Sequence, residues 1–304
     1  MAALIRQLAL VSESTRIPRN DVSKVSAAVQ KQAARDLAPI WDIAATIDSF
    51  DRLEDVPAGY WPMIVMDDIG VNAGGVHEDK DGQPFALISA SPDLDTWSLT
   101  TSHEALEMLV DPFGNRLIAG DSPNPDQGRV DFLVEVCDPC EAADFAYTAN
   151  GILVSDFYTP RYFDPVAAPA VRYSYTGALT EPRQVLRGGY LSWKEPVSDH
   201  WWQEIWFDSD QPTFRDMGPI DQKSKGNARA FIDRVTNADT VRAIARGRHK
   251  ASAAGLTAAV TAQASTSKAL IWRQQISEII GESGKATGEQ GKAGRRPARR
   301  PRSG

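Results

Sequence analysis

The sequence contains little cysteine and no long apolar run, and both shortages narrow the class of protein. Only two cysteines occur among 304 residues, Cys137 and Cys140, which is too few for a disulfide framework. No window contains the roughly 18 apolar residues of a membrane span. Residues 1–11 lack the long apolar centre and the small-residue cleavage site of a signal peptide, and they favour a first β-strand instead. We therefore expect a soluble, cytoplasmic protein with no membrane partner.

Several catalytic motifs are also missing. The sequence has no Gly-x-Ser-x-Gly, no P-loop and no Gly-x-Gly-x-x-Gly, so neither a nucleophilic serine nor a phosphate-binding loop is expected. Cys137 and Cys140 form a Cys-x-x-Cys, but the acidic residues around them favour a raised thiol pKa. No second pair completes a zinc ribbon. We expect two buried or half-buried thiols here rather than a redox centre or a structural zinc site.

Positive charge is scarce except at the end of the chain. The 33 basic and 40 acidic residues give a net charge of −7, yet the stretch from Lys285 onward holds seven basic residues and one acidic residue. The rest, with 26 basic and 39 acidic residues, carries −13. An acidic body argues against nucleic acid as a specific partner. Residues 246–304 are predicted to be a low-complexity, largely disordered tail, either solvated or contacting nucleic acid by unspecific electrostatics.

The rest of the chain alternates between strand-like and helix-like patterns. A helix is predicted over residues 21–35 from apolar residues at helical spacing, and Asp81-Gly82 marks a hairpin turn. Residues 70–78 are predicted to be a glycine-containing loop. Strands are predicted at residues 4–11, 41–50, 61–67 and 84–90, and a later hairpin at residues 188–194 and 200–207.

This order of elements predicts an α+β fold with a mixed sheet. We expect one domain over residues 1–245. Residues 1–150 would supply the sheet and one functional helix, and residues 151–245 a β-rich, aromatic completion that closes with a helix around residues 227–245.

The segment Thr101-Ser-His-Glu-Ala-Leu-Glu-Met-Leu-Val-Asp111 is the most informative part of the sequence. In the first turns of a helix, His103 and Glu107 are four residues apart and share a face, with Glu104 at its edge. Imidazole nitrogens and carboxylate oxygens both bind divalent metals. The spacing is that of the His-Glu-x-x-His helix of zinc metalloproteases, with glutamate in place of the second histidine. An amphipathic helix with these residues on its solvated face has the same pattern, and that alternative stays open.

A catalytic zinc needs a third protein ligand, and the acidic run over residues 131–141 offers one. This run fits a strand and a helix equally well, although Pro139 disfavours a regular helix. In a helical turn Glu135 and Asp138 would share a face. We expect Glu135 as the third ligand and Asp138 as the residue that orients His103 or as the alternate ligand. So many carboxylates also favour harder metals such as manganese or calcium.

Several segments together resemble a group of uncharacterised zincin-like, His-Glu-x-x-Glu proteins of bacteria and phages. The segments are Leu37–Asp42, Gly75–Ile88, Thr101–Pro112, Glu135–Glu141 and Val154–Pro160, and the resemblance covers roughly residues 1–210. It implies a zincin fold with the His103 helix as active-site helix. The chain departs from the main protease pattern at Glu107.

The resemblance also implies roles for three further parts of the chain. Residues 84–90 would be the sheet edge that pairs with an extended peptide substrate, with residues 70–81 overhanging the cleft. His77 is then either a group beside the metal or substrate, or a solvated loop histidine. Tyr158 either stabilises an oxyanion through its hydroxyl or is an ordinary packing tyrosine.

Two functions follow as hypotheses. The first is a zinc-dependent hydrolase, most simply a peptidase acting on a peptide or protein, in which His103, Glu107 and Glu135 hold the metal, Glu104 is the general base and Tyr158 assists. The second is a catalytically inert zincin-like scaffold that serves as a binding protein or as an assembly protein of a phage or mobile element.

Overall fold

The computed structural model describes residues 5–70, 73–220, 228–229, 231–232 and 236. These residues form helices and three sheets, which confirms the predicted α+β class. The predicted tail at residues 246–304 and most of the helix predicted around residues 227–245 lie outside them. Within the described residues, no helix is both long and apolar enough to cross a membrane.

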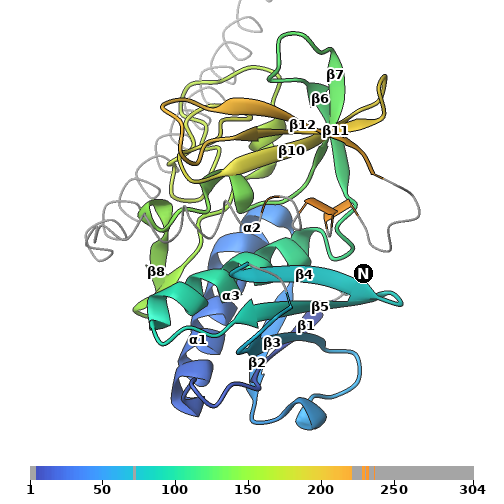
Figure 1. Ribbon diagram of the computed structural model, residues 1–304. Coiled ribbons are helices and arrows are strands. Elements are labelled where there is room, and N and C mark those ends of the chain that lie inside the picture. Colours follow the sequence, from blue (N-terminus) through green and yellow to red (C-terminus); the bar gives the residue numbers. More distant parts are fainter. Residues whose placement is uncertain (1–4, 71–72, 221–227, 230, 233–235, 237–304) are drawn as a thin grey trace, which may run out of the picture. The chain divides into compact units, whose positions relative to one another are not determined.

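The first sheet has the strand order β2-β1-β3-β5-β4 (Figure 1). Its strands are β1 Arg6–Ser12, β2 Ala45–Phe50, β3 Trp61–Met66, β4 Gly75–Lys80 and β5 Gln83–Ser89. The first three and β5 are parallel, whereas β4 runs antiparallel to β5. Leu8, Ala9 and Leu10 of the central strand are all fully buried, and such an unbroken buried run is typical of a strand covered on both faces.

The edge of this sheet differs from the expectation. Residues 84–90 were expected at the edge, but β5 lies between β3 and β4, and β4 is the last strand in the order. The segment predicted as a loop at residues 70–78 therefore contains most of the edge strand. The short turn at Asp81-Gly82 forces this pairing, because it aligns Lys80 with Gln83 and His77 with Ala86.

A long helical segment packs on this sheet. Helix α1, Arg19–Gln32, continues through a π-helical turn at Ala33–Leu37 into α2, Ala38–Trp41, and ends at Asp42 with φ of 54°. Val22, Val25 and Val29 face the core, which confirms the predicted periodicity, although the helix runs beyond residue 35. The buried Asp36 in the π-helical turn accepts hydrogen bonds from the hydroxyls of Tyr147 (2.8 Å) and Tyr175 (2.7 Å). These bonds fasten the later part of the chain to this helix.

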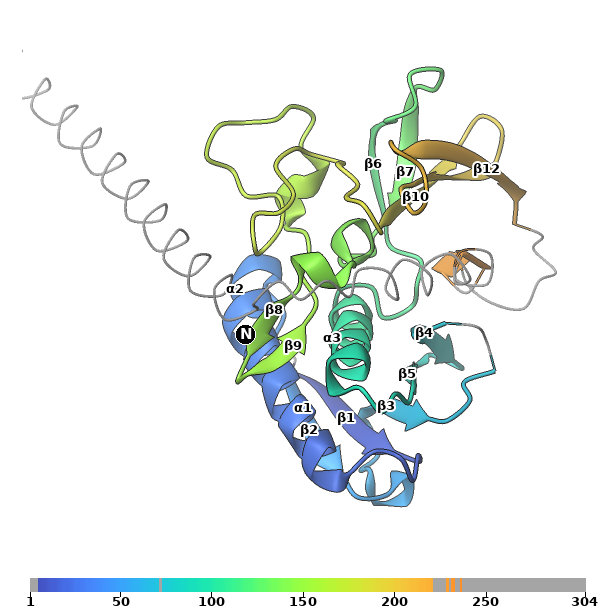
Figure 2. The same ribbon diagram turned by 60° about the vertical axis from the view of Figure 1, so that its left-hand side comes forward.

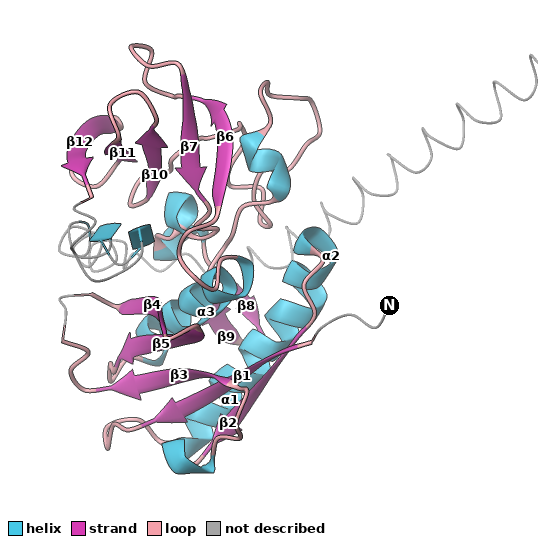
Figure 3. Ribbon diagram, turned by 90° about the vertical axis from the view of Figure 1, so that its right-hand side faces the viewer, coloured by secondary structure: helices cyan, strands magenta, loops and turns pink. Residues whose placement is uncertain are grey.

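Helix α3, Leu94–Val110, lies at the centre of the fold (Figures 2 and 3). It begins at Asp93, whose side chain accepts a hydrogen bond from the Asp95 backbone N–H at 3.3 Å. Every residue from Trp97 to Val110 is buried, because β4 and β5, α1, and the hairpin of β8 (Tyr147–Ala149) and β9 (Ile152–Val154) all pack on it. His103 therefore lies in the middle of a buried helix rather than in its first turns. The alternative of a solvated amphipathic face is wrong.

The second sheet is antiparallel and has the order β12-β11-β10-β7-β6. Its strands are β6 Leu117–Asp121, β7 Arg129–Leu133, β10 Tyr190–Glu195, β11 His200–Ile205 and β12 Thr213–Pro219. The pairing of β10 with β11 confirms the predicted hairpin. Strand β7 ends at Leu133, so Glu135 follows a strand and Asp138 begins a single 3-10 turn, Asp138–Cys140. The two acids thus do not share a helical turn. Leu8 of the first sheet and Phe132 of the second belong to one hydrophobic core.

The fit between β4 and α3 depends on the absence of a side chain at Gly75. A Cβ atom there would lie 2.6 Å from Thr100 Cγ2 and 2.8 Å from Glu104 Cγ. Gly75→Ala is expected to destabilise the protein by about 1–3 kcal/mol through overpacking, as measured by urea unfolding. Gly128→Ala is the matched control, because no atom lies within 4 Å of a Cβ there. Equal stability of the two variants would contradict the described packing.

Candidate metal centre

Four separate parts of the chain bring buried ionisable side chains together. Helix α3 supplies three of them, β4 one, the segment after β7 three more, and the helical residues near position 229 the last. Each of these residues is at most 8% exposed. They are His77, His103, Glu104, Glu107, Glu135, Asp138, Glu141 and Arg229, and we call this group the charged cluster.

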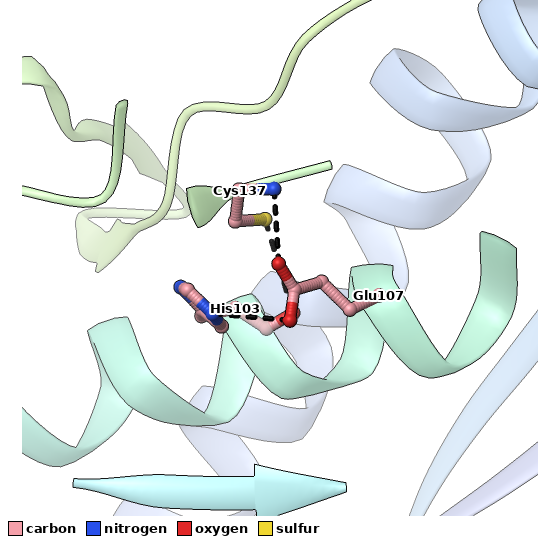
Figure 4. A group of neighbouring side chains, drawn as sticks. All are labelled: His103, Glu107 and Cys137. Carbon is pink, nitrogen blue, oxygen red and sulfur yellow. Dashed lines mark hydrogen bonds and ion pairs between the residues drawn. The ribbon is translucent and has the colours of Figure 1, made fainter. Parts of the chain in front are cut away.

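His103, Glu107 and Asp138 form the most compact part of the charged cluster. His103 Nε2 lies 3.1 Å from Glu107 Oε2 and 3.3 Å from Asp138 Oδ1. Two ligands of one tetrahedral zinc, each at about 2.0–2.1 Å, are roughly 3.3 Å apart, so these separations suit a shared metal. Figure 4 shows His103 and Glu107 side by side on α3, with the Cys137 backbone N–H donating to Glu107 Oε1 at 3.1 Å. That bond fixes the Glu107 carboxylate and leaves Oε2 toward His103.

Arg229 forms ion pairs with three of the carboxylates. Its guanidinium lies 2.9 Å from Glu107 Oε2, 3.1 Å from Glu135 Oε2 and 2.8 Å from Asp138 Oδ2. Of the other oxygens, Glu135 Oε1 is buried and makes no hydrogen bond among the described residues, and Asp138 Oδ1 faces His103 Nε2. Arg229 thus orients Glu135 and Asp138 by one oxygen each, whereas on Glu107 it contacts Oε2, the oxygen that also faces His103. The donor set fits a divalent metal because carboxylate oxygens and His103 Nε2 converge in one buried space.

His77 was weighed as a solvated loop histidine, and that reading is wrong. It lies in β4 and is fully buried. Its Nε2 is 3.3 Å from the backbone oxygen of Asp111, while Nδ1 is 3.4 Å from Glu104 Oε2 and 3.8 Å from Glu107 Oε2. If Nε2 donates to the Asp111 carbonyl, Nδ1 presents a lone pair toward the two carboxylates.

Burial and neighbouring charges shift the pKa values of four acids in the charged cluster. Burial, helped by neighbouring carboxylates and opposed by Arg229, raises the pKa of Glu135 well above its usual range. Burial also raises the pKa of Asp138, and it raises the pKa of Glu141 well above its usual range. Burial opposes the ionisation of Glu107, but Arg229 and His103 outweigh it and hold the pKa of Glu107 below its usual range. Protons or a cation must therefore balance the remaining acids.

The two cysteines are both free and buried, as expected. Burial, reinforced by Glu107, raises the pKa of the Cys137 thiol well above its usual range, and burial does the same for Cys140. Neither is an activated thiolate. The Cys137 sulfur, His103 and Glu107 are close enough to hold one ion, so Cys137 belongs to the wall of the site.

Tyr158 lies beside the charged cluster without bonding to it. Its ring stacks on Tyr162 with centroids 4.4 Å apart, and the hydroxyl is buried without a hydrogen bond in the described residues. Burial, with contributions from Tyr162 and Glu135, raises the pKa of Tyr158 well above its usual range. Tyr158 is thus a core residue, and its part in any reaction stays a prediction.

The structure gathers His103, Glu104, Glu107, Glu135 and Asp138 as the sequence suggested, but it pairs the two later acids differently. Asp138 lies next to His103, whereas Glu135 Oε2 lies 4.0 Å from His77 Nε2. The choice between them as third ligand remains a prediction. Sequence reasoning gave no role to Arg229 or Glu141. Glu141 lies in the acidic run over residues 131–141, so the sequence contains a signal for it, but no local pattern marks Arg229.

Comparisons with family models, with proteins of curated function and with solved structures give no match for this chain. The chemistry of the charged cluster must therefore be judged from its own geometry.

Removing the Arg229 guanidinium would leave three buried carboxylates without their shared counter-charge. We expect Arg229→Met, measured by urea unfolding in the presence of EDTA, to lower the free energy of unfolding by about 3–5 kcal/mol. Arg161→Met is the control, because its ion pair with Asp164 leaves the arginine 59% exposed and is worth at most about 1 kcal/mol. Similar losses for the two variants would show that the Arg229 ion pairs do not stabilise the fold.

Proposed function

We propose that this chain is a metal-dependent hydrolase of the peptidase type. The observation that carries the proposal is the convergence of His103 Nε2, Glu107 Oε2 and Asp138 Oδ1 at separations of 3.1 and 3.3 Å in a buried, acid-rich site. His103 and Glu107 would hold the metal together with Asp138 or Glu135. Zinc is the first expectation, and manganese the second because the donors are mostly carboxylates.

A bound divalent metal would supply an acidic water, whose pKa such ions lower to about 7. The chain's own part is to accept and pass on the proton. Glu104 is suited to this task because it neighbours the ligand His103 on α3, and its Oε2 is buried beside His77 Nδ1, 3.4 Å away. Its carboxylate can therefore take a proton at Oε2 and deliver it to a leaving group. Tyr158 is the nearby hydroxyl proposed to assist an oxyanion.

The sheet edge supports a peptide as substrate. β4 is the last strand in its sheet, and it carries His77 directly against α3. An extended peptide can add to such an edge through backbone hydrogen bonds. The resemblance to zincin-like proteins implies an edge strand near the metal helix, but at residues 84–90; here the edge strand is β4, so the resemblance is matched only by the presence of an edge strand that packs on α3.

One observation favours the second candidate, an inert scaffold. Arg229 already gives the carboxylates a cation, with three ion pairs at 3.1 Å or less. In a scaffold, these ion pairs alone would hold α3, the segment after β7 and the helical residues near position 229 together, and no metal would be required.

Metal content separates the two candidates. We expect protein purified without added metal to contain at least one equivalent of zinc or manganese by mass spectrometry, and EDTA to lower its melting temperature. A ligand at 1,000 times its dissociation constant stabilises a protein by about 4 kcal/mol. His103→Ala and Glu107→Gln should lose this metal and the EDTA effect. Glu104→Gln should keep the metal and lose hydrolysis of an unfolded casein probe.

His200→Ala is the matched histidine control, because His200 lies on β11 and pairs with Asp216 at 3.0 Å, away from the charged cluster. It should keep both metal and melting temperature. Metal-free wild-type protein whose stability is unchanged by EDTA would end the hydrolase proposal and favour the scaffold.

A further inference from the structure

The charged cluster contains two ligand groups that share no residue. One consists of His77, Glu107 and Glu135, and the other of His103, Asp138 and Glu141. In each group, one donor atom from every residue lies within 4.8 Å of the others. Each has one imidazole and two carboxylates, a donor set that suits zinc or manganese. The groups meet at Glu107, whose Oε2 is 3.1 Å from His103 Nε2 and 3.8 Å from His77 Nδ1.

Orphaned donor atoms occur in both groups. In the first, His77 Nδ1 and Glu135 Oε1 are buried without a hydrogen bond among the described residues. In the second, the same holds for Asp138 Oδ1 and Glu141 Oε1. Their residues are at most 4% exposed. His77 Nδ1 and Asp138 Oδ1 face charged partners of the cluster, whereas a cation in each group would offset the cost of burying Glu135 Oε1 and Glu141 Oε1.

His77, Glu135 and Asp138 are each held by a further polar contact, as the ligands of a metal usually are. His77 Nε2 is 3.3 Å from the Asp111 backbone oxygen, and an imidazole that donates one N–H to a carbonyl presents its other nitrogen to a metal. Arg229 holds Glu135 by Oε2 and Asp138 by Oδ2, which directs Oε1 and Oδ1 elsewhere. Arg229 therefore fastens Glu107 and Glu135 of the first group and Asp138 of the second, and it leaves one oxygen of Glu135 and one of Asp138 for a cation.

The charge of the charged cluster matches two divalent ions. With Glu104, the two groups contain five carboxylates, and the ion pairs of the described residues give them one guanidinium, that of Arg229. Both histidines are neutral when they bind metal. Five ionised carboxylates and one guanidinium leave a net charge of −4, which one divalent ion only halves and two cancel.

We propose that the charged cluster is a two-metal site, in which His103, Asp138 and Glu141 hold one divalent cation, His77 and Glu135 hold the second, and Glu107 bridges them. This inference rests on the proposed hydrolase function and extends it. Paired metals stabilise both the attacking and the leaving oxygen in hydrolysis. His77 and Glu141 thereby become ligands, and Glu104 remains the proton acceptor.

Metal stoichiometry tests this inference on the full chain. Protein stripped with EDTA is titrated with Mn²⁺, and bound metal per folded chain is measured by mass spectrometry together with the electron paramagnetic resonance spectrum. We expect two ions per wild-type chain and the spectrum of two coupled, adjacent ions. His77→Ala and the isosteric Glu135→Gln should each bind one ion and give the spectrum of an isolated ion. Glu135→Gln serves if His77→Ala does not fold.

The control is His200→Ala, which should bind two coupled ions like the wild type. One ion per wild-type chain, lost in His103→Ala and kept in His77→Ala, would overturn the second site and leave the hydrolase proposal standing. Two uncoupled ions that persist in both His77→Ala and Glu135→Gln would also overturn it. No bound ion at all would overturn both proposals.

Discussion

The burial of negative charge against α3 is the constraint on which the rest of this structure depends. Five carboxylates of the charged cluster are at most 4% exposed. Isolated ionised carboxylates are very costly in such surroundings, so they require protons, guanidinium or metal. The elements packed on α3 either supply charged residues of the cluster or bury those residues. The packing around α3 is therefore inseparable from the chemistry of the cluster.

The two sheets serve this helix in different ways. The first sheet supports α3 and supplies His77 from its antiparallel edge strand. The second supplies the segment that follows β7, where the chain leaves the sheet and places Glu135, Asp138 and Glu141 over the helix. Gly189, just before β10, permits this approach, because a Cβ there would lie 2.6 Å from the Asp138 backbone oxygen. A site built between two sheets needs such close backbone contacts to hold its geometry.

Periodicity and turn chemistry were sufficient for much of the fold. The valines of α1, the apolar centre of β1 and the short turn between β4 and β5 are local signals. Local signals could not show that His77 is buried, because three of the six residues of β4 are charged and the burial of His77 comes from the packing of β4 on α3. The spacing of His103 and Glu107 correctly predicted a shared space, but not that the helix around them is buried on all sides. Arg229 reaches the site only through the tertiary fold.

The distance along the chain between Arg229 and its partners has a consequence during synthesis. Arg229 is 91 residues beyond Asp138, the residue it binds at 2.8 Å. A ribosome adds about 5–20 residues each second, so α3 and its acids leave the ribosome seconds before their guanidinium does. During that interval these acids stay hydrated or are balanced by protons or metal. The ion pairs of Arg229 can therefore form only after the other residues of the charged cluster have been synthesised.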